Sequence, residues 1–341
     1  MSRIGILSWP QLIGAFICIY LASCQTLQDI KLKLVEDIVS AKDIASLQTI
    51  LSKTASGINN SPANVNAVAI VGGGLSGLTA CLYLLEEGHN VLLIERSDFL
   101  GGNSAKASSG VNGAYTTYQD EEDIEDSSEK FFEDTLMSSK RSAASNPFTA
   151  SLIRRMVDDS KEAVEWLLDR ARIPPPILVG RMGGHNASRT HRPKSGLAGA
   201  AFIAGLESAV SMYKESKQLV IKTGTRLADI ERDSATSWRL RIVDEESKSS
   251  SELIAPAVII CTGGFGNDKE GESSLLKEVT PDLVNLGSTN TKFTTGDGIK
   301  MAREVGAKTI DMELVQVHPT GFSVSAWRPT GTFVHHLFTT S

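Results

Sequence analysis

Cysteine is scarce in this chain of 341 residues, which contains only four, and their spacing excludes several kinds of site. There is no CxxC pair and no CxxCH motif, so the sequence predicts neither a common zinc site nor covalent haem nor an iron–sulfur cluster. Cys18 and Cys24 lie in the N-terminal segment, and Cys81 and Cys261 lie in apolar stretches where a small buried side chain is expected. We therefore expect no metal site and no disulfide framework.

An excess of positive charge is also missing. The chain has 34 Lys and Arg against 40 Asp and Glu, a formal net charge of −6. This balance argues against nucleic acid as a general partner, although it leaves room for a locally basic pocket that binds an anion. Hydrophobic residues make up 41% of the chain, which is typical of a globular protein, and the length predicts about two domains.

The N-terminal segment, residues 1–24, differs in composition from the rest. Arg3 precedes an apolar stretch from Ile4 to Ser23, which predicts a signal peptide or a membrane anchor with membrane contact through residues 4–23. Leu21-Ala22-Ser23-Cys24 would also suit lipid attachment in a bacterium, and a buried N-terminal helix is the remaining alternative. We therefore expect the protein to enter the secretory pathway or endoplasmic reticulum, or to be anchored in a membrane. Mitochondria are the alternative location.

Residues 25–63 connect this segment to the globular part. Apolar side chains recur at near-helical spacing from Leu27 to Leu51, which predicts an amphipathic helix. Ser52–Asn66 is rich in Ser, Asn, Gly and Ala and is typical of a linker, so we expect the globular domain to start near residue 64.

The most informative stretch runs from Ala67 to Ala114. An apolar run, Ala67–Val71, leads into a glycine-rich turn and a helical pattern, and a second run, Val91–Ile94, ends in Glu95. This order of strand, glycine turn, helix, strand and acid predicts a βαβ unit that holds an ADP moiety, with the phosphates at the helix N-terminus and the ribose at the carboxylate. The glycines are Gly72, Gly74 and Gly77, and the helical apolar residues are Leu75, Leu78, Leu82 and Leu85.

Further along the chain the pattern changes twice. Leu152–Arg170 has helical periodicity, and we interpret the acidic run Asp120–Glu129 as a solvated loop or helix face without a function. Alternation in Trp238–Val243 predicts an antiparallel excursion. Ala257–Cys261 then predicts a buried strand, and a second glycine turn, Thr262-Gly263-Gly264, follows it. The expected core residues of the helical stretch are Ile153, Val157, Val164, Leu167 and Leu168.

Several motifs together carry a family resemblance. They are Gly101-Gly102-Asn103-Ser104 with Ala107–Asn112, Arg189-Thr190-His191-Arg192-Pro193, Cys261–Gly266, Thr295-Gly296-Asp297-Gly298 and Gln316-Val317-His318-Pro319-Thr320-Gly321. In order and spacing they resemble the soluble, single-chain FAD-dependent fumarate reductases over roughly residues 64–322. Succinate dehydrogenase flavoprotein and L-aspartate oxidase are more distant members of this family.

The resemblance implies an α/β fold with an FAD-binding, Rossmann-like domain of the glutathione reductase type, a parallel sheet with an antiparallel excursion, and only the start of a capping domain. It implies FAD as the cofactor. Relatives that bind FAD covalently use a His in this loop, and no His lies between Gly101 and Gly113, so we expect non-covalent FAD. The predicted cofactor-binding residues are Gly72, Gly74, Ser76, Gly77, Glu95, Asn103, Ser104, Ser108, Ser109, Gly110, Cys261, Gly263 and Asp297.

The resemblance also implies a reaction, in which a hydride passes from reduced flavin N5 to fumarate and gives succinate. His318 is expected to bind a carboxylate of this small dicarboxylate substrate. His191, between Arg189 and Arg192, is expected either to offer positive charge near the flavin or to form a surface salt bridge. The electron donor is expected to be reduced free flavin or an NADH-linked partner.

The resemblance ends after Phe322. The family's general-acid Arg is absent, because Ser323–Thr330 lacks the family's motif and Arg328 lies too close to His318. We therefore expect residues 64–316 to form the FAD-binding domain and residues 317–341 to be the truncated start of the capping domain. Two hypotheses follow: the chain belongs to a working fumarate reductase and this sequence is a truncated gene model or splice product, or the short chain is a non-catalytic flavin-binding remnant or interaction protein.

Overall fold

The computed structural model describes residues 19–20, 62–139, 146, 148–321 and 337–340. The predicted signal or anchor segment, apart from residues 19–20, lies outside the described residues. So do the expected amphipathic helix over 27–51 and the segment 323–330.

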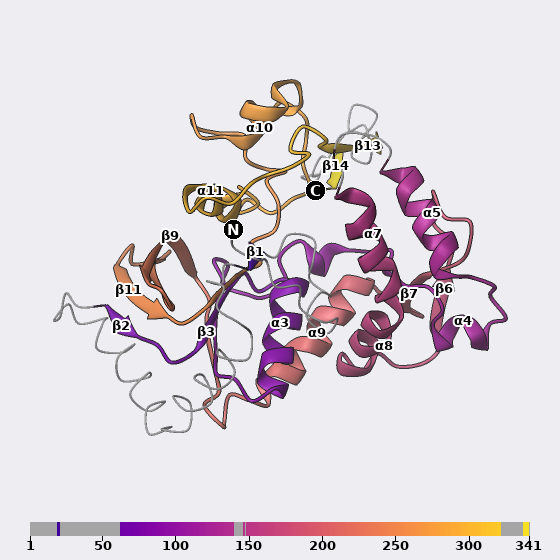
Figure 1. The fold of residues 1–341 in the computed structure, drawn as a ribbon, viewed down its shortest axis with the longest axis horizontal. Helices are drawn as coiled ribbons and strands as arrows, with labels where there is room; N and C mark the ends of the chain where they lie inside the picture. Colours follow the sequence, from indigo (N-terminus) through magenta and orange to yellow (C-terminus); the bar gives the residue numbers. More distant parts are fainter. Residues whose placement is uncertain (1–18, 21–61, 140–145, 147, 322–336, 341) are drawn as a thin grey trace, which may run out of the picture.

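A parallel sheet forms the centre of the molecule (Figure 1). Its strands follow the order β12-β3-β4-β8, and β1 (Ile19–Tyr20) pairs antiparallel with the outer edge of β12. Every residue of β3 and β4 is buried, as the two apolar runs predicted. The parallel strands are β3 (Val68–Val71), β4 (Val91–Ile94), β8 (Leu219–Lys222) and β12 (Val258–Ile260).

Successive side chains of a strand point to opposite faces of the sheet, so each strand contributes to two separate cores. Ile70 and Leu93 face a core built on helices α3 (Leu75–Glu86) and α9 (Ala198–Ser211). Ala69 and Leu92 face a second core, which the antiparallel excursion covers. The sheet therefore lies between a helical layer and a β layer.

The antiparallel excursion forms a second sheet in the order β2-β11-β10-β9. Its inward side chains include Trp238, Leu240 and Ile242, all buried, which confirms the predicted alternation. The expected linker ends earlier than predicted, because residues 63–64 pair with β11 as a strand. The strands are β2 (Ala63–Asn64), β9 (Thr225–Ser234), β10 (Ser237–Asp244) and β11 (Ser250–Ala255).

Of the short connections between the two sheets, two run side by side. Residues 65–67 lead from β2 into β3, and residues 256–257 lead from β11 into β12. The N–H of Val65 donates to the carbonyl of Ile254 (2.8 Å), and the N–H of Ala69 donates to the carbonyl of Ala257 (3.0 Å). The paired strands on either side are parallel, so both connections leave one sheet and enter the other in the same direction.

A helical region lies on the other side of α3 and α9 from the antiparallel sheet (Figure 1). The predicted helix over 152–170 is two helices, because the backbone leaves the helix at Asp159 and a new helix begins at Ser160. Its five expected core residues are all buried. The elements are β5 (Val111–Asn112), α4 (Thr117–Glu121), α5 (Ser128–Ser138), α7 (Thr149–Asp158), α8 (Ser160–Arg170), β6 (Ile177–Gly180) and β7 (Thr190–Pro193), with the strands in the order β5-β7-β6.

The remaining elements lie near the ends of the parallel strands (Figure 1). They are η3 (Ser104–Lys106), α10 (Leu275–Val279), η4 (Pro281–Leu283), α11 (Asp297–Glu304), β13 (Gln316–Gly321) and β14 (Leu337–Thr340). Within the described part of the chain, no helix is long and apolar enough to cross a membrane, and no group of His, Cys, Asp or Glu side chains is arranged to hold a metal ion.

Candidate functional site

The turn between β3 and α3 depends on two glycines. Gly72 has a φ of +107°, and a Cβ atom there would lie 2.2 Å from the carbonyl oxygen of Cys261. A Cβ atom on Gly77 would lie 1.8 Å from the carbonyl oxygen of Gly72. The first contact brings the end of β12 against the turn, and the second brings α3 against β3. A side chain at either position would displace backbone, so the tight packing of the βαβ unit requires glycine here.

The N-terminus of α3 offers a place for an anion. Gly74 is its N-cap and has no side chain to cap the helix, and the first turn has no acidic residue. Within 4 Å of a Cβ atom on Gly74 there would be only the Ser104 hydroxyl, at 3.3 Å, and the Gly101 carbonyl, at 3.8 Å. No acidic side chain of the helix's own first turn neutralises the positive end of the helix dipole, which favours an anion such as a phosphate there.

Glu95 closes the turn from the side of β4. Its Oε2 atom accepts a hydrogen bond from the N–H of Gly73 (2.7 Å), and its Oε1 atom accepts one from the N–H of Ser97 (2.7 Å). The residue is only 9% exposed. A carboxylate can accept about four hydrogen bonds, so Glu95 keeps capacity for the hydroxyl groups of a ribose.

The loop after β4 lies against the same turn. The Ser104 hydroxyl accepts a hydrogen bond from the N–H of Leu75 (3.2 Å), and the N–H of Gly101 donates to the carbonyl of Gly73 (2.8 Å). Ser108 and Ser109 are exposed. Ser104 also lines a cavity of about 160 Å³, whose other lining residues are Leu75, Ala107, Gly110, Val111, Gly199 and Phe202.

The second glycine turn lies against the first one. The N–H of Cys261 donates to the carbonyl of Val71 (2.7 Å), and the Ser76 hydroxyl contacts the Cys261 sulfur at 3.4 Å. Gly263 has a φ of +73° and open space where a side chain would be. Asp297 begins α11 and is bound by the Arg96 guanidinium (2.9 Å) and the Thr295 hydroxyl (2.8 Å).

Asn103 points away from the glycine turn. Its side-chain amide donates to Asn290 Oδ1 (2.8 Å) and to Thr294 Oγ1 (3.0 Å), and its Oδ1 atom accepts from the N–H of Thr291 (3.0 Å). Nearby, Lys106 Nζ donates to the carbonyl of Thr289 (2.9 Å). Both amide hydrogens of Asn103 are thus engaged by the 289–294 segment.

His191 is fully buried, which fits neither expected role. Its Nε2 atom lies 2.7 Å from the Thr116 hydroxyl, and its Nδ1 atom lies 2.9 Å from the carbonyl oxygen of Arg189. Burial lowers the pKa of His191, although its backbone hydrogen bonds oppose this shift. We therefore correct the expectation of a positive charge or a surface salt bridge at this residue.

The neighbouring Arg189 has a role that the sequence did not show. It is fully buried, and its guanidinium binds Asp126 through two nitrogens (2.9 and 2.7 Å) and Asp134 through a third (2.6 Å). It also stacks on the Phe131 ring at 4.6 Å. The interpretation of the acidic run 120–129 as solvated is therefore wrong for Asp126, whose side chain is 1% exposed.

The pKa values of both carboxylates reflect this ion pair. Burial pushes the pKa of Asp126 up, but hydrogen bonds from Arg189, Gln119 and the N–H of Ser127 outweigh it, and the net shift is downward. The pKa of Asp134 is lowered in the same way, since its bonds to Asn186 and Arg189 outweigh its burial. Arg189 is thus a charged centre that joins α5 to the segment before β7.

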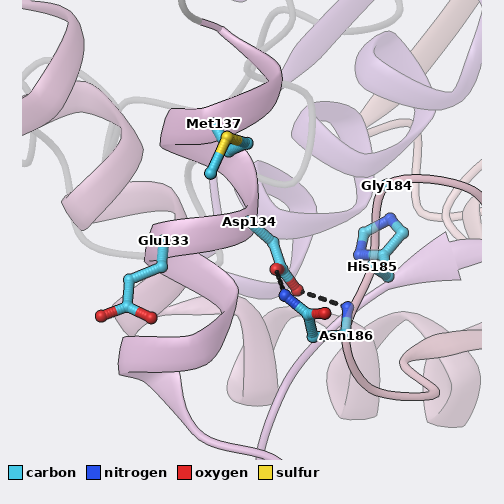
Figure 2. A pocket seen from close by; sticks show the side chains of 6 residues that line it. All are labelled: Glu133, Asp134, Met137, Gly184, His185 and Asn186. Atoms are coloured by element: carbon cyan, nitrogen blue, oxygen red, sulfur yellow. Dashed lines mark hydrogen bonds between the residues drawn. The ribbon is translucent and has the colours of Figure 1, made fainter.

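A shallow pocket of about 380 Å³ lies beside this ion pair (Figure 2). It is lined by Glu133, Asp134, Met137, Gly184, His185 and Asn186. The side-chain amide of Asn186 donates to Asp134 Oδ1 (2.5 Å), and the backbone N–H of Asn186 donates to Asp134 Oδ2 (2.8 Å). Both hydrogen bonds are drawn in Figure 2. His185 Nδ1 contacts Arg189 at 3.0 Å, and its pKa is lowered by burial and by that cation. Asp134 and Asn186 thus bind each other, and His185 binds the buried Arg189.

The residues around the two glycine turns fit an ADP-containing cofactor. They provide a helix N-terminus beside Gly74 with no acidic residue in its first turn, a carboxylate with remaining acceptor capacity at Glu95, and a cavity beside Ser104. All lie at the carboxyl end of the parallel strands, which is where open α/β sheets bind dinucleotides.

Comparison with known proteins identifies the cofactor. Residues 67–338 match the model of the FAD binding domain family. The chain belongs to this family. FAD is therefore its cofactor, as expected.

The relatives of this FAD binding domain include fumarate reductases. Fumarate reductase 1 of Saccharomyces cerevisiae is 37% identical over 266 residues, which cover 76% of this chain and 54% of that one. Fumarate reductase of Schizosaccharomyces pombe is 35% identical over 77% of this chain and 51% of its own length. The chain thus spans about half the length of the curated relatives it matches.

A solved structure gives the same picture. The open conformation of a flavocytochrome c3 fumarate reductase superposes with a TM-score of 0.66 at 28% identity, over 80% of this chain and 45% of that one. The expected FAD-binding α/β fold and the resemblance to fumarate reductases are thereby confirmed.

Proposed function

We propose that this chain forms the FAD-bearing part of a fumarate reductase, in which a hydride passes from reduced flavin to fumarate and gives succinate. The observation that supports it is the dinucleotide cradle of Gly74, Ser104 and Glu95 in a chain 37% identical to Fumarate reductase 1 of Saccharomyces cerevisiae. When bound and reduced, the flavin would supply the hydride, so the protein has to orient the reactants and exclude water.

In this proposal the described residues bind the cofactor. The N-terminus of α3, with Gly72, Gly74, Ser76 and Gly77, holds the pyrophosphate, and Glu95 holds the adenosine ribose. Asn103 lies in the loop after β4 and supports cofactor binding through its hydrogen bonds to the 289–294 segment. The flavin side is formed by Ser104, Ser108, Ser109 and Gly110 from one loop and by Cys261, Gly263 and Asp297 from the other. With no His between Gly101 and Gly113, FAD is held non-covalently.

The substrate end of the proposal rests on His318. Its backbone lies in β13, and its side chain lies outside the described part of the structure. We propose that it binds one carboxylate of the dicarboxylate and so helps to polarise the double bond. The proton donor is not this residue, and in the proposal it comes from the half of the relatives that this chain does not span.

Two features of the cellular setting also stay proposals. Reduced free flavin or an NADH-linked partner would supply electrons. Residues 1–24 would direct the protein to the secretory pathway or to a membrane, with mitochondria as the alternative. A fusion of residues 1–24 to a fluorescent protein distinguishes these locations, and uniform cytosolic fluorescence would contradict all of them.

The decisive experiment reconstitutes the full 341-residue chain with FAD. Quenching of flavin fluorescence measures binding, and release of the flavin into the supernatant after acid precipitation tests for non-covalent attachment. The bound flavin is then photoreduced without oxygen, and its reoxidation is followed with and without fumarate. We expect non-covalent FAD and no fumarate-dependent reoxidation by this chain alone.

A chimera completes the test. Appending the part of the Saccharomyces cerevisiae relative that lies beyond the matched region should restore reoxidation by fumarate, and His318→Ala in that chimera should abolish it while FAD stays bound. A chimera that binds FAD but reacts no faster with fumarate than without it would favour the alternative, a non-catalytic flavin-binding protein. The observation that supports this alternative is that Ser323–Thr330 lacks the family's motif.

A further inference from the structure

Two segments that are far apart in the sequence are tied together beside the FAD site. One is the loop from Arg96 to Lys106, which follows β4, and the other is the 289–297 segment, which leads into α11. Three side chains of the first segment bind the second: Arg96, Asn103 and Lys106. We refer to these three contacts as the clasp.

Asn103 makes the central contact. Three hydrogen bonds of 2.8 to 3.0 Å join its amide to Asn290, Thr291 and Thr294. The backbone N–H of Thr291 needs an acceptor, which fixes the amide orientation and leaves both amide hydrogens for Asn290 and Thr294. One side chain therefore binds three residues of the opposite segment.

The flanking contacts act on either side of Asn103. The Arg96 guanidinium binds Asp297 at 2.9 Å and Glu245 at 2.8 Å and lies over the Phe293 ring at 4.4 Å. Lys106 Nζ binds the carbonyl of Thr289 at 2.9 Å. The clasp thus spans the 289–297 segment from end to end.

The clasp also touches the residues that hold the cofactor. Ser104, which follows Asn103, accepts the N–H of Leu75 at the start of α3. The 289–297 segment is bound to the second glycine turn, because the N–H of Gly296 donates to the carbonyl of Gly264 (3.1 Å). Movement of either segment would therefore move one of the two glycine turns.

We propose that Asn103 is a positioning residue that keeps the 289–297 segment closed over the FAD site and slows the release of FAD. The proposal uses the FAD-binding assignment alone and does not depend on the substrate. It assigns to Asn103 a role through Asn290, Thr291 and Thr294 in place of direct donation to the cofactor.

The first test needs no cofactor. Lys292 is exposed and lies within the clasped segment, so trypsin cleaves after it only when the local backbone opens. In the full chain without FAD, Asn103→Ala should raise the rate of cleavage after Lys292 about tenfold, since several hydrogen bonds are lost. Asn290→Ala should act in the same direction, and Asn290→Asp, which keeps an acceptor for the Asn103 amide, should restore slow cleavage.

The second test measures FAD release. The full chain is loaded with FAD and mixed with an excess of a competing apo-flavoprotein, and the rise of free flavin fluorescence gives the dissociation rate. Asn103→Ala should raise this rate about tenfold. The double variant Asn103→Ala/Asn290→Ala should release FAD no faster than the more affected single variant. Both substitutions remove the same contact, so their effects on the rate should not add.

Asn186→Ala is the matched control. It also removes an asparagine amide that binds across two segments, but it lies at the Asp134 ion pair. It should leave both rates unchanged. Equal rates in wild type and Asn103→Ala would overturn the proposal, and so would equal increases in Asn103→Ala and Asn186→Ala, which would show general destabilisation.

Discussion

The carboxylate of Glu95 lies against the first glycine turn and accepts a 2.7 Å hydrogen bond from the N–H of Gly73. Glu95 directly follows β4, and Gly73 lies two residues after β3, so this bond joins the ends of two neighbouring strands. The same carboxylate is thus both a candidate ligand for ribose and a support for the loop that holds the phosphates.

Replacing Glu95 should weaken FAD binding. Glu95→Gln keeps one acceptor oxygen, so one of the N–H groups of Gly73 and Ser97 loses its partner. We expect the Kd for FAD to rise about tenfold, since charge-assisted hydrogen bonds are lost. Titration of flavin fluorescence measures this. Glu252→Gln, at a side chain 44% exposed on the antiparallel sheet, should leave the Kd unchanged.

A methyl group on Gly77 should disrupt the βαβ unit. Its Cβ atom would lie 1.8 Å from the carbonyl oxygen of Gly72, so α3 has to move away from β3. We expect Gly77→Ala to lower the free energy of unfolding by about 1–3 kcal/mol, as overpacking does. Urea denaturation measures the difference. Gly183→Ala, where a Cβ atom meets nothing within 4 Å, serves as the control, and equal losses in both variants would contradict this reading.

Removing Arg189 should cost more than removing an exposed arginine. Arg189→Met leaves Asp126 and Asp134 buried without their cation, and we expect a loss of about 3–5 kcal/mol in the free energy of unfolding. Arg241→Met, whose ion pair with Asp229 is about half exposed, should cost at most about 1 kcal/mol.

A triple variant shows where the cost of Arg189→Met arises. Adding Asp126→Asn and Asp134→Asn removes the uncompensated charges and should recover part of the loss. Denaturation curves of the three proteins decide this. If the triple variant is no more stable than Arg189→Met, lost packing explains the effect better than buried charge does.

Two histidines near the Arg189 ion pair, the buried His191 and the half-buried His185, should make the protein less stable in mild acid. Burial lowers the pKa values of His191 and His185 in the folded protein, so below the unfolded value of about 6.5 the unfolded chain binds more protons. Their contribution is present above that pH and is lost as the pH falls through the folded pKa. The lowered pKa values of Asp126 and Asp134 act in the same direction below about pH 4.

Thermal denaturation as a function of pH tests this. The Tm of the wild type should fall between pH 7 and pH 5, and His185→Gln should make this fall less steep. A Tm that rises on acidification would contradict the assignment of neutral histidines.

The part of the site predictable from sequence is the part encoded locally. The run Ala67–Val71, the glycines and the spacing from Leu75 to Leu85 lie within one βαβ unit, so periodicity alone places β3, α3 and β4. Arg189 was beyond this reach because its carboxylate partners lie 63 and 55 positions earlier, on other elements.

Two further differences have equally specific causes. The break at Asp159 leaves the apolar periodicity of 152–170 intact, so the sequence pattern shows no interruption there. The Asn103 side chain is predictable as a member of the cofactor loop, but its direction is set by the N–H of Thr291, 188 positions away. Side-chain direction of this kind depends on tertiary contacts.

The paired connections between the two sheets have a mechanical consequence. One connection alone would let the two sheets rotate against each other. Residues 65–67 and 256–257 run side by side, and hydrogen bonds join them to the neighbouring strands. Rotation of one sheet against the other would therefore strain both connections. The antiparallel sheet is therefore coupled rigidly to the strands that carry the glycine turns. A spectroscopic label on β10 would therefore report the orientation of the cofactor-binding edge of the parallel sheet. Movement of the helical region would not change this signal.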